Sequence, residues 1–174
     1  VVVLLNHGHY LNAPFWDFRQ YRKVPFHSTM KQILTAEQIE SMTADEINKV
    51  IREELYYDDY KWQKENNIKI TEDFRADGLN KILYKCPHCL SEGKTVGKGI
   101  YLTCEDCGKK WELTELGEMK AVDGETEFSH IPDWYEWERE CVRQEILDGT
   151  YHFEDDVHVH SLPGVKFVDI GKAH

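Results

Sequence analysis

The chain has 174 residues, a hydrophobic content of 41% and a formal net charge of -11. Its length suits one medium domain or two small ones with a buried core. The acidic balance disfavours binding to nucleic acid or to an anionic membrane through this segment, because both depend on clustered Lys and Arg. No apolar run approaches the ~20 residues of a membrane helix. The first residues show no signal-peptide pattern.

The first residues read VVVLLNHGHYLNAPFW. The apolar run Val1 to Leu5 is typical of a strand that is covered on both faces. Because this run has no Met and no turn before it, we expect the chain to be an excerpt whose partner strands lie upstream. Residues 22–29 and 31–34 are predicted to be extended, and Pro25 indicates that the first of them is an edge or irregular strand.

Two capping boxes follow, in which Thr35 is paired with Gln38 and Thr43 with Glu46. The second box begins a predicted amphipathic helix with apolar residues at helical spacing, namely Ile47, Val50, Ile51 and Leu55. We expect residues 56–67 to continue as helix or helical turns, with the pair Asp58-Asp59 on the surface.

A second helix is predicted from Pro132 to about Leu147, because Pro is tolerated in a first turn and Asp148-Gly149 ends the pattern. Its predicted apolar stripe consists of Trp134, Trp137, Cys141, Val142 and Ile146. Residues 117–127 read as a polar connection. Residues 150–160 alternate in part, and residues 165–170 read as a further strand.

The strongest chemical signal is the pair of motifs CPHC and CEDCG, which place Cys86, Cys89, Cys104 and Cys107 in two Cys-x-x-Cys turns 14 residues apart. Zinc prefers four thiolates in a tetrahedron, and each such turn presents two sulfurs to the ion. The short strands predicted between and after the turns complete a zinc ribbon. We therefore expect a structural Zn site. The cysteine spacing and the absence of a secretion signal favour a reducing, cytoplasmic compartment over disulfides.

Other interpretations of these cysteines and of the remaining reactive residues are less favoured. A redox dithiol needs only one pair, and a catalytic zinc keeps one position open for water. His88 is the only nearby substitute ligand, and the ribbon's near-neutral charge does not favour nucleic acid. Cys141 is predicted to be a buried apolar residue. A solvated face is favoured over a metal cluster for His152, Glu154, Asp155, Asp156, His158 and His160.

Four segments carry a resemblance to a known family: VVVLLNHGHYLNAPFWDF, YDDYKWQKENN, FRADGLNKILYKCPHC and DGETEFSHIPDWYEWERE. Together they resemble the C-terminal part of bacterial lysophospholipid acyltransferases, the 1-acylglycerol-3-phosphate acyltransferase family, in members with a zinc-ribbon insertion. The resemblance implies acyl transfer from acyl-CoA or acyl carrier protein to the hydroxyl of a lysophospholipid or glycerol phosphate, in phospholipid biosynthesis. It also implies an α/β acyltransferase sheet and contact of an upstream region with the inner face of the membrane.

The family's catalytic His-x-x-x-x-Asp motif is absent from this chain, because no histidine is followed by Asp at that spacing. The excerpt alone is therefore predicted to be inactive, with no catalytic residue of its own. In the intact enzyme, the residues after the first strand could line the acceptor or acyl pocket. These candidate substrate-binding residues are Asn6, His7, His9, Asn12, Phe15 and Trp16. The simpler interpretation is that His7 and His9 bond the backbone of a tight loop.

The predicted fold class is α+β. It comprises the last strands of an acyltransferase-like sheet (1–34), a helical segment (35–80), the zinc ribbon (81–116), and a C-terminal helix with a β segment (117–174). The alternative function is a non-enzymatic zinc-ribbon module that binds a protein or, less favoured, a nucleic acid.

Overall fold

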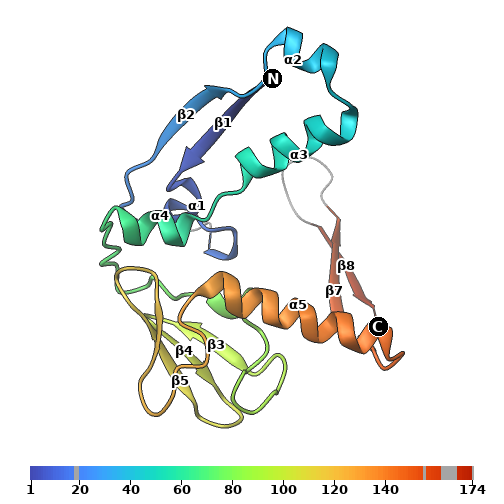
Figure 1. Cartoon of the computed structure of the whole chain (residues 1–174). Helices are drawn as coiled ribbons and strands as arrows, with labels where there is room; N and C mark the ends of the chain where they lie inside the picture. The colour runs from blue at the N-terminus through green and yellow to red at the C-terminus, as the bar shows by residue number, and fades with distance from the viewer. Residues whose placement is uncertain (18–19, 155, 162–167, 174) are drawn as a thin grey trace. The chain divides into compact units, whose positions relative to one another are not determined.

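Short helices and antiparallel sheets alternate along the chain in the computed structural model, which describes residues 1–17, 20–154, 156–161 and 168–173 (Figure 1). The fold is mixed α+β, as predicted. Two compact units are present, Val1–Glu138 and Arg139–His174. Asp155 and residues 165–167 of the predicted last strand lie outside the described residues.

The N-terminal sheet is a two-stranded antiparallel ribbon of β1 (Val2–His7) and β2 (His27–Gln32), in which His7 faces His27. The predicted strand is therefore present, but coverage on both faces was wrong, because only Val3 in it is buried while Val2 is 58% and Leu4 55% exposed. The two predicted extended segments, 22–29 and 31–34, contribute one strand over residues 27–32, and residues 22–26 and 33–34 lie outside it. Between the strands lie α1 (His9–Asn12) and the 3-10 turn η1 (Phe15–Asp17).

Both predicted capping boxes are confirmed at the N-termini of α2 (Ala36–Ser41) and α3 (Ala44–Leu55). In each box the Thr side chain accepts from the third backbone N–H, and the Gln or Glu side chain accepts from the Thr N–H. The apolar stripe of α3 is only half covered, since none of this helix's described side chains is buried.

The next helix is shorter than the sequence suggested. The chain is extended at Tyr56, and α4 (Asp59–Glu65) starts only after Asp58, whose carboxylate accepts from the N–H groups of Tyr60 and Lys61. This side chain is only 11% exposed, so the expectation of a surface Asp58 was wrong. A capping carboxylate has to lie against the backbone that it caps.

The zinc-ribbon segment forms a four-stranded antiparallel sheet in the order β3-β4-β5-β6. Its strands are β3 (Thr95–Lys98), β4 (Tyr101–Cys104), β5 (Lys110–Leu113) and β6 (Met119–Ala121). The last strand falls in the predicted polar connection, which is a correction. It was overlooked because only Met119 and Ala121 face the core, and two apolar residues make a weak alternating pattern.

The core of the first unit lies between this sheet, the 3-10 turn η2 (Leu79–Lys81) and the start of α5 (Ile131–Leu147). Trp111 of β5 and Trp134 of α5 are fully buried with ring centroids 5.0 Å apart. Gly97 of β3 presses on η2 so closely that a Cβ would lie 2.4 Å from the Ala76 carbonyl oxygen. The ribbon is therefore packed into the unit rather than attached by a linker.

The second unit contains the later turns of α5 and the antiparallel pair β7 (Val157–Ser161) and β8 (Val168–Ala173). The predicted stripe of α5 holds only in part. Trp134 is buried and Cys141 partly buried, whereas Ile146 is 59% exposed. None of the helices in the described part of the chain has the length and apolarity needed to cross a membrane.

Candidate functional site

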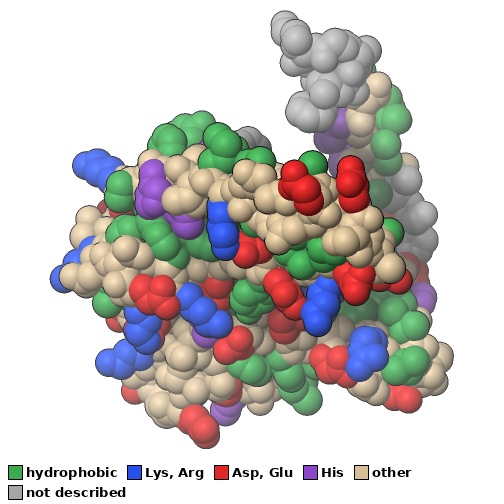
Figure 2. All heavy atoms as spheres, turned by 45° about the horizontal axis from the view of Figure 1, so that its top comes forward, with side chains coloured by type: hydrophobic (Ala, Val, Ile, Leu, Met, Phe, Trp, Pro, Cys, Tyr) green, Lys and Arg blue, Asp and Glu red, His purple; other side chains and the backbone are tan. Residues whose placement is uncertain are grey.

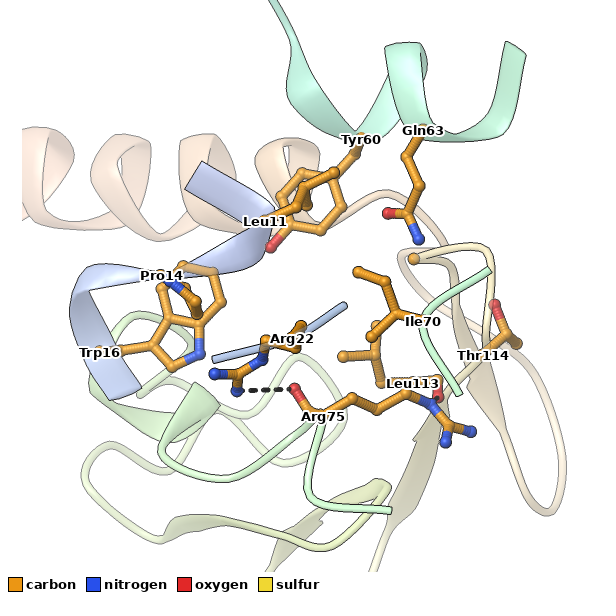
Figure 3. Close-up of a pocket in the computed structure, with 11 residues that line it drawn as sticks. Leu11, Pro14, Trp16, Arg22, Tyr60, Gln63, Ile70, Arg75, Leu113 and Thr114 are labelled. Atoms are coloured by element: carbon orange, nitrogen blue, oxygen red, sulfur yellow. Dashed lines mark hydrogen bonds between the residues drawn. The ribbon is translucent and has the colours of Figure 1, made fainter. Parts of the chain in front are cut away.

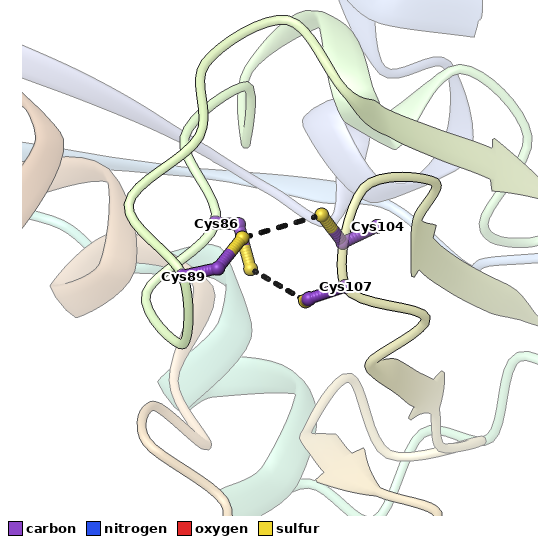
Figure 4. Close-up of side chains that lie close together, drawn as sticks. All are labelled: Cys86, Cys89, Cys104 and Cys107. Carbon is purple, nitrogen blue, oxygen red and sulfur yellow. Dashed lines mark hydrogen bonds between the residues drawn. The ribbon is translucent and has the colours of Figure 1, made fainter.

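The four cysteines of the two Cys-x-x-Cys motifs converge on one point between the turn before β3 and the turn after β4 (Figure 4). Both turns have the same backbone hydrogen bonds. The N–H of Cys86 donates to Ser91 O and that of Cys104 to Lys109 O, at 2.9 and 2.8 Å. In each turn the N–H four residues later, of Leu90 or Gly108, returns to the cysteine carbonyl at 2.9 Å. We call these two turns the first and second knuckles.

The sulfur positions match a tetrahedral zinc site. Sγ of Cys86 lies 3.8 Å from Sγ of Cys107, and Sγ of Cys89 lies 3.7 Å from Sγ of Cys104. All four sulfurs lie within 4.8 Å of one another. Zn–S bonds of about 2.3 Å give a regular tetrahedron an edge of about 3.8 Å. A disulfide would need a separation of about 2.05 Å, and all the cysteines are free.

The cysteines differ in their surroundings. Cys86 and Cys104 are buried, Cys89 is partly buried and Cys107 is exposed. Burial raises the pKa of the Cys86 thiol, whereas hydrogen bonding to the side chain and backbone of Ser91 lowers the pKa of Cys89 to about 6. Cys89 therefore supplies a thiolate readily at neutral pH.

The first knuckle rests on α5. Lys85, which directly precedes Cys86, donates its N–H to Oε1 of Glu138 at 2.9 Å and accepts from Nε1 of Trp134 at 3.0 Å. Glu138 has no exposed surface, and its burial raises its pKa to about 8. A carboxyl group that is protonated over much of the physiological range thus lies beneath the metal turn.

His88 takes no part in the sulfur cluster. Its Nδ1 lies 3.4 Å from Oε1 of Glu127, and its side chain is 55% exposed. The same glutamate accepts from Nε1 of Trp111 at 2.9 Å. His88 therefore points to the loop that crosses the sheet, and the four cysteines form the complete ligand set suggested by the described residues.

Most of the predicted substrate-binding residues are engaged with their own hairpin and loop. Asn6 accepts from Ser28 Oγ at 2.6 Å, and His7 Nε2 lies 3.0 Å from Thr29 Oγ1. The His7 ring stacks on His27 at 4.7 Å, while the exposed His9 has an edge contact with Phe26.

The remaining three diverge in position. Asn12 donates to the Arg22 carbonyl, and Trp16 is buried at 3% exposure. Phe15 is 63% exposed and is the one member of the six that lines the larger groove described below. The structure thus does not gather the predicted residues into one pocket. A single strand-exit loop can aim only some of its side chains outward.

Trp16 instead lines a small cavity between the loop, α4 and the ribbon (Figure 3). Its volume of about 20 Å³ is close to that of one water molecule, so it excludes an organic ligand. Gln63 of α4 is buried at its edge and donates from Nε2 to Ile68 O at 3.1 Å and to Glu115 O at 3.0 Å. These bonds tie α4 to the turn between β5 and β6.

The sequence did not predict a second polar contact, between the start of α4 and the segment before α5. Nε2 of His130 lies 2.8 Å from Oδ2 of Asp58, and Asp59 accepts from the Gly8 N–H at 2.9 Å. These residues are 72 and 51 positions apart. In the sequence, the pair Asp58-Asp59 was the one sign of this contact, and it does not indicate which residues the two carboxylates bind.

A possible set of metal ligands of another kind lies on the second unit. His158, His160 and Asp169 have ligand atoms within 4.8 Å of one another, and all three are exposed. His158 Nδ1 lies 3.3 Å from Asp169 Oδ2. The expectation that His158 and His160 share a strand face agrees with their ring separation of 5.9 Å.

Charge is mixed on the visible surface. On the face shown in Figure 2, acidic and basic side chains are interspersed with apolar ones, and the whole chain is acidic. No basic field gathers on this face.

Comparison with known proteins identified no relative. No family model, curated protein or solved structure matches the chain.

Proposed function

We propose that the chain is a zinc-ribbon protein that binds one Zn²⁺ through Cys86, Cys89, Cys104 and Cys107. The observation that carries this proposal is the pair of sulfur separations, 3.8 and 3.7 Å, which equal the edge of a zinc–thiolate tetrahedron of about 3.8 Å. Zinc rather than a harder cation is favoured because all four donors are soft thiolates.

The role proposed for the metal is structural. Four thiolates close the coordination shell, so no position remains for a substrate or an activated water. The metal would instead join the two knuckles, which are otherwise linked through the short hairpin of β3 and β4. Metal binding in such a site contributes directly to the free energy of folding.

Metal analysis of the purified chain tests this proposal. We expect one zinc per chain, a Cys104→Ser variant that loses it, and a Cys141→Ser variant that keeps it, since Cys141 lies outside the cluster. Prolonged chelation should abolish the near-UV signal of the packed pair Trp111 and Trp134, and added zinc should restore it. A stoichiometry near zero in protein purified under reducing conditions without chelator would refute the assignment.

For the larger protein we propose a part in acyl transfer to a lysophospholipid or glycerol phosphate. The support is the resemblance of the NHGHYLNAPFW and HIPDWYEWERE segments to acyltransferases. The first test is the sequence of the natural gene product: a His-x-x-x-x-Asp motif upstream of Val1 would support the proposal. A product without that motif, and without acyl transfer from acyl-CoA or acyl carrier protein, would favour the non-enzymatic module.

A further inference from the structure

An open groove of about 580 Å³ lies in the first unit beside α4 and the start of α5. This volume is typical of sites for small molecules. Its walls come from the loop after β1, the junction of α3 and α4, and the first turns of α5, which Figure 1 shows in one region of this unit. Six of the lining side chains are aromatic: Tyr10, Phe15, Tyr56, Tyr57, Tyr60 and Tyr135.

The aromatic rings form a connected surface. The ring centroids of Phe15 and Tyr10 are 6.0 Å apart, those of Tyr10 and Tyr60 are 6.5 Å apart, and those of Tyr60 and His130 are 6.3 Å apart. Tyr60 is buried, whereas Phe15 is 63% and Tyr135 43% exposed. The Tyr60 ring is therefore held by packing, while the exposed rings of Phe15, Tyr135 and Tyr56, the last 77% exposed, remain accessible to a ligand.

The charged groups of the groove are mostly negative. Four carboxylates line it, those of Asp58, Asp59, Asp133 and Glu136, against Lys61 and the imidazole of His130. Burial raises the pKa of Tyr10 to about 12, with a smaller contribution from the nearby Asp59 carboxylate. A phosphate or carboxylate ligand would be repelled here, and a cation would be attracted.

The two carboxylates at the start of α4 already accept backbone N–H groups. Asp58 Oδ1 accepts from Tyr60 at 3.0 Å and from Lys61 at 3.1 Å, and Asp59 Oδ1 accepts from Gly8 at 2.9 Å. These bonds fix both side chains, and Asp58 is also paired with His130 Nε2 at 2.8 Å and with Lys61 Nζ at 3.8 Å. The two carboxylates therefore favour a ligand that is attracted by their negative charge and does not need to donate hydrogen bonds to them.

We propose that this groove binds a small organic cation of the quaternary ammonium class. Such a group has no N–H to satisfy, and its methyl groups pack on aromatic faces that attract it through their quadrupoles. The carboxylates supply the counter-charge. The site is separate from the four cysteines and requires neither the metal nor acyl transfer.

Binding of choline and of its neutral carbon isostere, 3,3-dimethylbutan-1-ol, tests the proposal on the full chain. The two probes share shape and hydroxyl group and differ only in charge. We expect saturable choline binding by calorimetry or by NMR shifts, at least tenfold tighter than binding of the isostere. Equal affinities, or no saturable binding of choline, would overturn the proposal.

Matched variants locate the binding. Phe15→Ala and Tyr135→Ala should each weaken choline binding at least threefold, whereas Tyr21→Ala, at an exposed tyrosine outside the groove, should not. Asp133→Asn removes a carboxylate of the groove. Its control is Asp45→Asn outside the groove, because both residues lie in the first turn of a helix. Equal effects of groove and control variants, in proteins with unchanged melting temperatures, would contradict the assignment.

The quaternary ammonium could be a free solute or the headgroup of a lipid. Phosphatidylcholine vesicles that retain the chain and release it on addition of choline would identify the headgroup, with phosphatidylglycerol vesicles as control. Choline binding without vesicle retention would identify a free cation. Both results support the proposal, whereas vesicle retention in a chain that fails to bind choline counts against it.

Discussion

The two knuckles of the ribbon share their hydrogen bonds but differ in what holds them. In the first knuckle Leu90 adopts φ 65°, the left-handed conformation that Gly108 adopts at φ 76° in the second. The first knuckle is supported by α5 through Lys85 and Glu138, whereas the second ends in the exposed Cys107. Equal sulfur geometry is thus reached from a strained, supported turn and from a relaxed, exposed one.

This difference indicates how the metal site divides its tasks. A left-handed Leu costs on the order of 1–2 kcal/mol, and we expect the two hydrogen bonds between Lys85 and α5 to offset that cost. The second knuckle needs no support, because glycine adopts the required conformation freely. The predictions that follow test this division.

Replacing a ligand in either knuckle should have the largest effect. We expect Cys86→Ser and Cys107→Ser both to lose stoichiometric zinc, since a tetrahedral site with one thiolate missing binds far more weakly. Cys86→Ser should also unfold the ribbon more completely, because it leaves a polar group in a fully buried place. Metal analysis and thermal unfolding monitored at the tryptophans measure both effects, and identical melting curves would contradict the asymmetry.

The support beneath the first knuckle should depend on pH. The pKa of Glu138 is raised to about 8 from 4.5, so the folded state retains a proton that the unfolded state releases. Stability attributable to this group is therefore present below pH 4.5 and is lost as the pH rises to 8. We expect a loss on the order of 3–5 kcal/mol, at about 1.4 kcal/mol per pKa unit.

Glu138→Gln keeps an acceptor for the Lys85 N–H and cannot ionise. Its melting temperature should equal that of the unsubstituted chain near pH 5 and exceed it near pH 8.5, with zinc present throughout. Glu65→Gln, at an exposed position of α4, is the matched control. Its melting temperature should change with pH in the same way as that of the unsubstituted chain. Parallel curves for Glu138→Gln would mean that the buried carboxyl does not titrate as proposed.

A Cβ at Gly108 in the second knuckle should impose the same backbone strain that Leu90 has in the first knuckle. Gly108→Ala adds a Cβ with no neighbour within 4 Å, so its cost comes from the backbone alone. We expect about 1 kcal/mol of destabilisation, measured by denaturant unfolding of the zinc-loaded chain. A neutral result would show that the second knuckle does not need its glycine.

The smallest expected effect has the opposite sign. Leu90→Gly should relieve the left-handed strain, and little burial is lost because Leu90 is 60% exposed. After the entropy cost of glycine, we expect a gain of about 0.5 kcal/mol under the same denaturant conditions. A clear destabilisation would show that the Leu90 side chain contributes packing that its exposure conceals.

The convergence of the four cysteines and the two capping boxes could be predicted because their determinants are local. Two residues between cysteines, or a Thr three residues before Glu46, determine the geometry within a single turn. The exposure of Val2 and Leu4 could not be predicted, because coverage of a strand depends on what packs against it. A continuous apolar run has the same sequence pattern whether the strand is covered on both faces or exposed on one of them.

The groove was missed for a similar reason. Its walls join Tyr10, the segment around Asp58 and the segment around His130, which only the fold brings together. The sequence showed the aromatic and acidic residues of each segment. It did not show that the three segments lie together. A contact such as that of His130 with Asp58, across 72 residues, produces no periodic pattern in the sequence.

Gln63 joins the ribbon to the helix that forms one wall of the groove. Its amide binds the turn at Glu115, next to β5 of the ribbon, while Tyr60, one helical turn earlier, forms a wall of the groove. If metal loss loosens that turn, the wall loses its anchor and choline binds less tightly. Thermodynamic reciprocity then requires choline to raise the affinity for zinc by the same factor, so each titration predicts the outcome of the other.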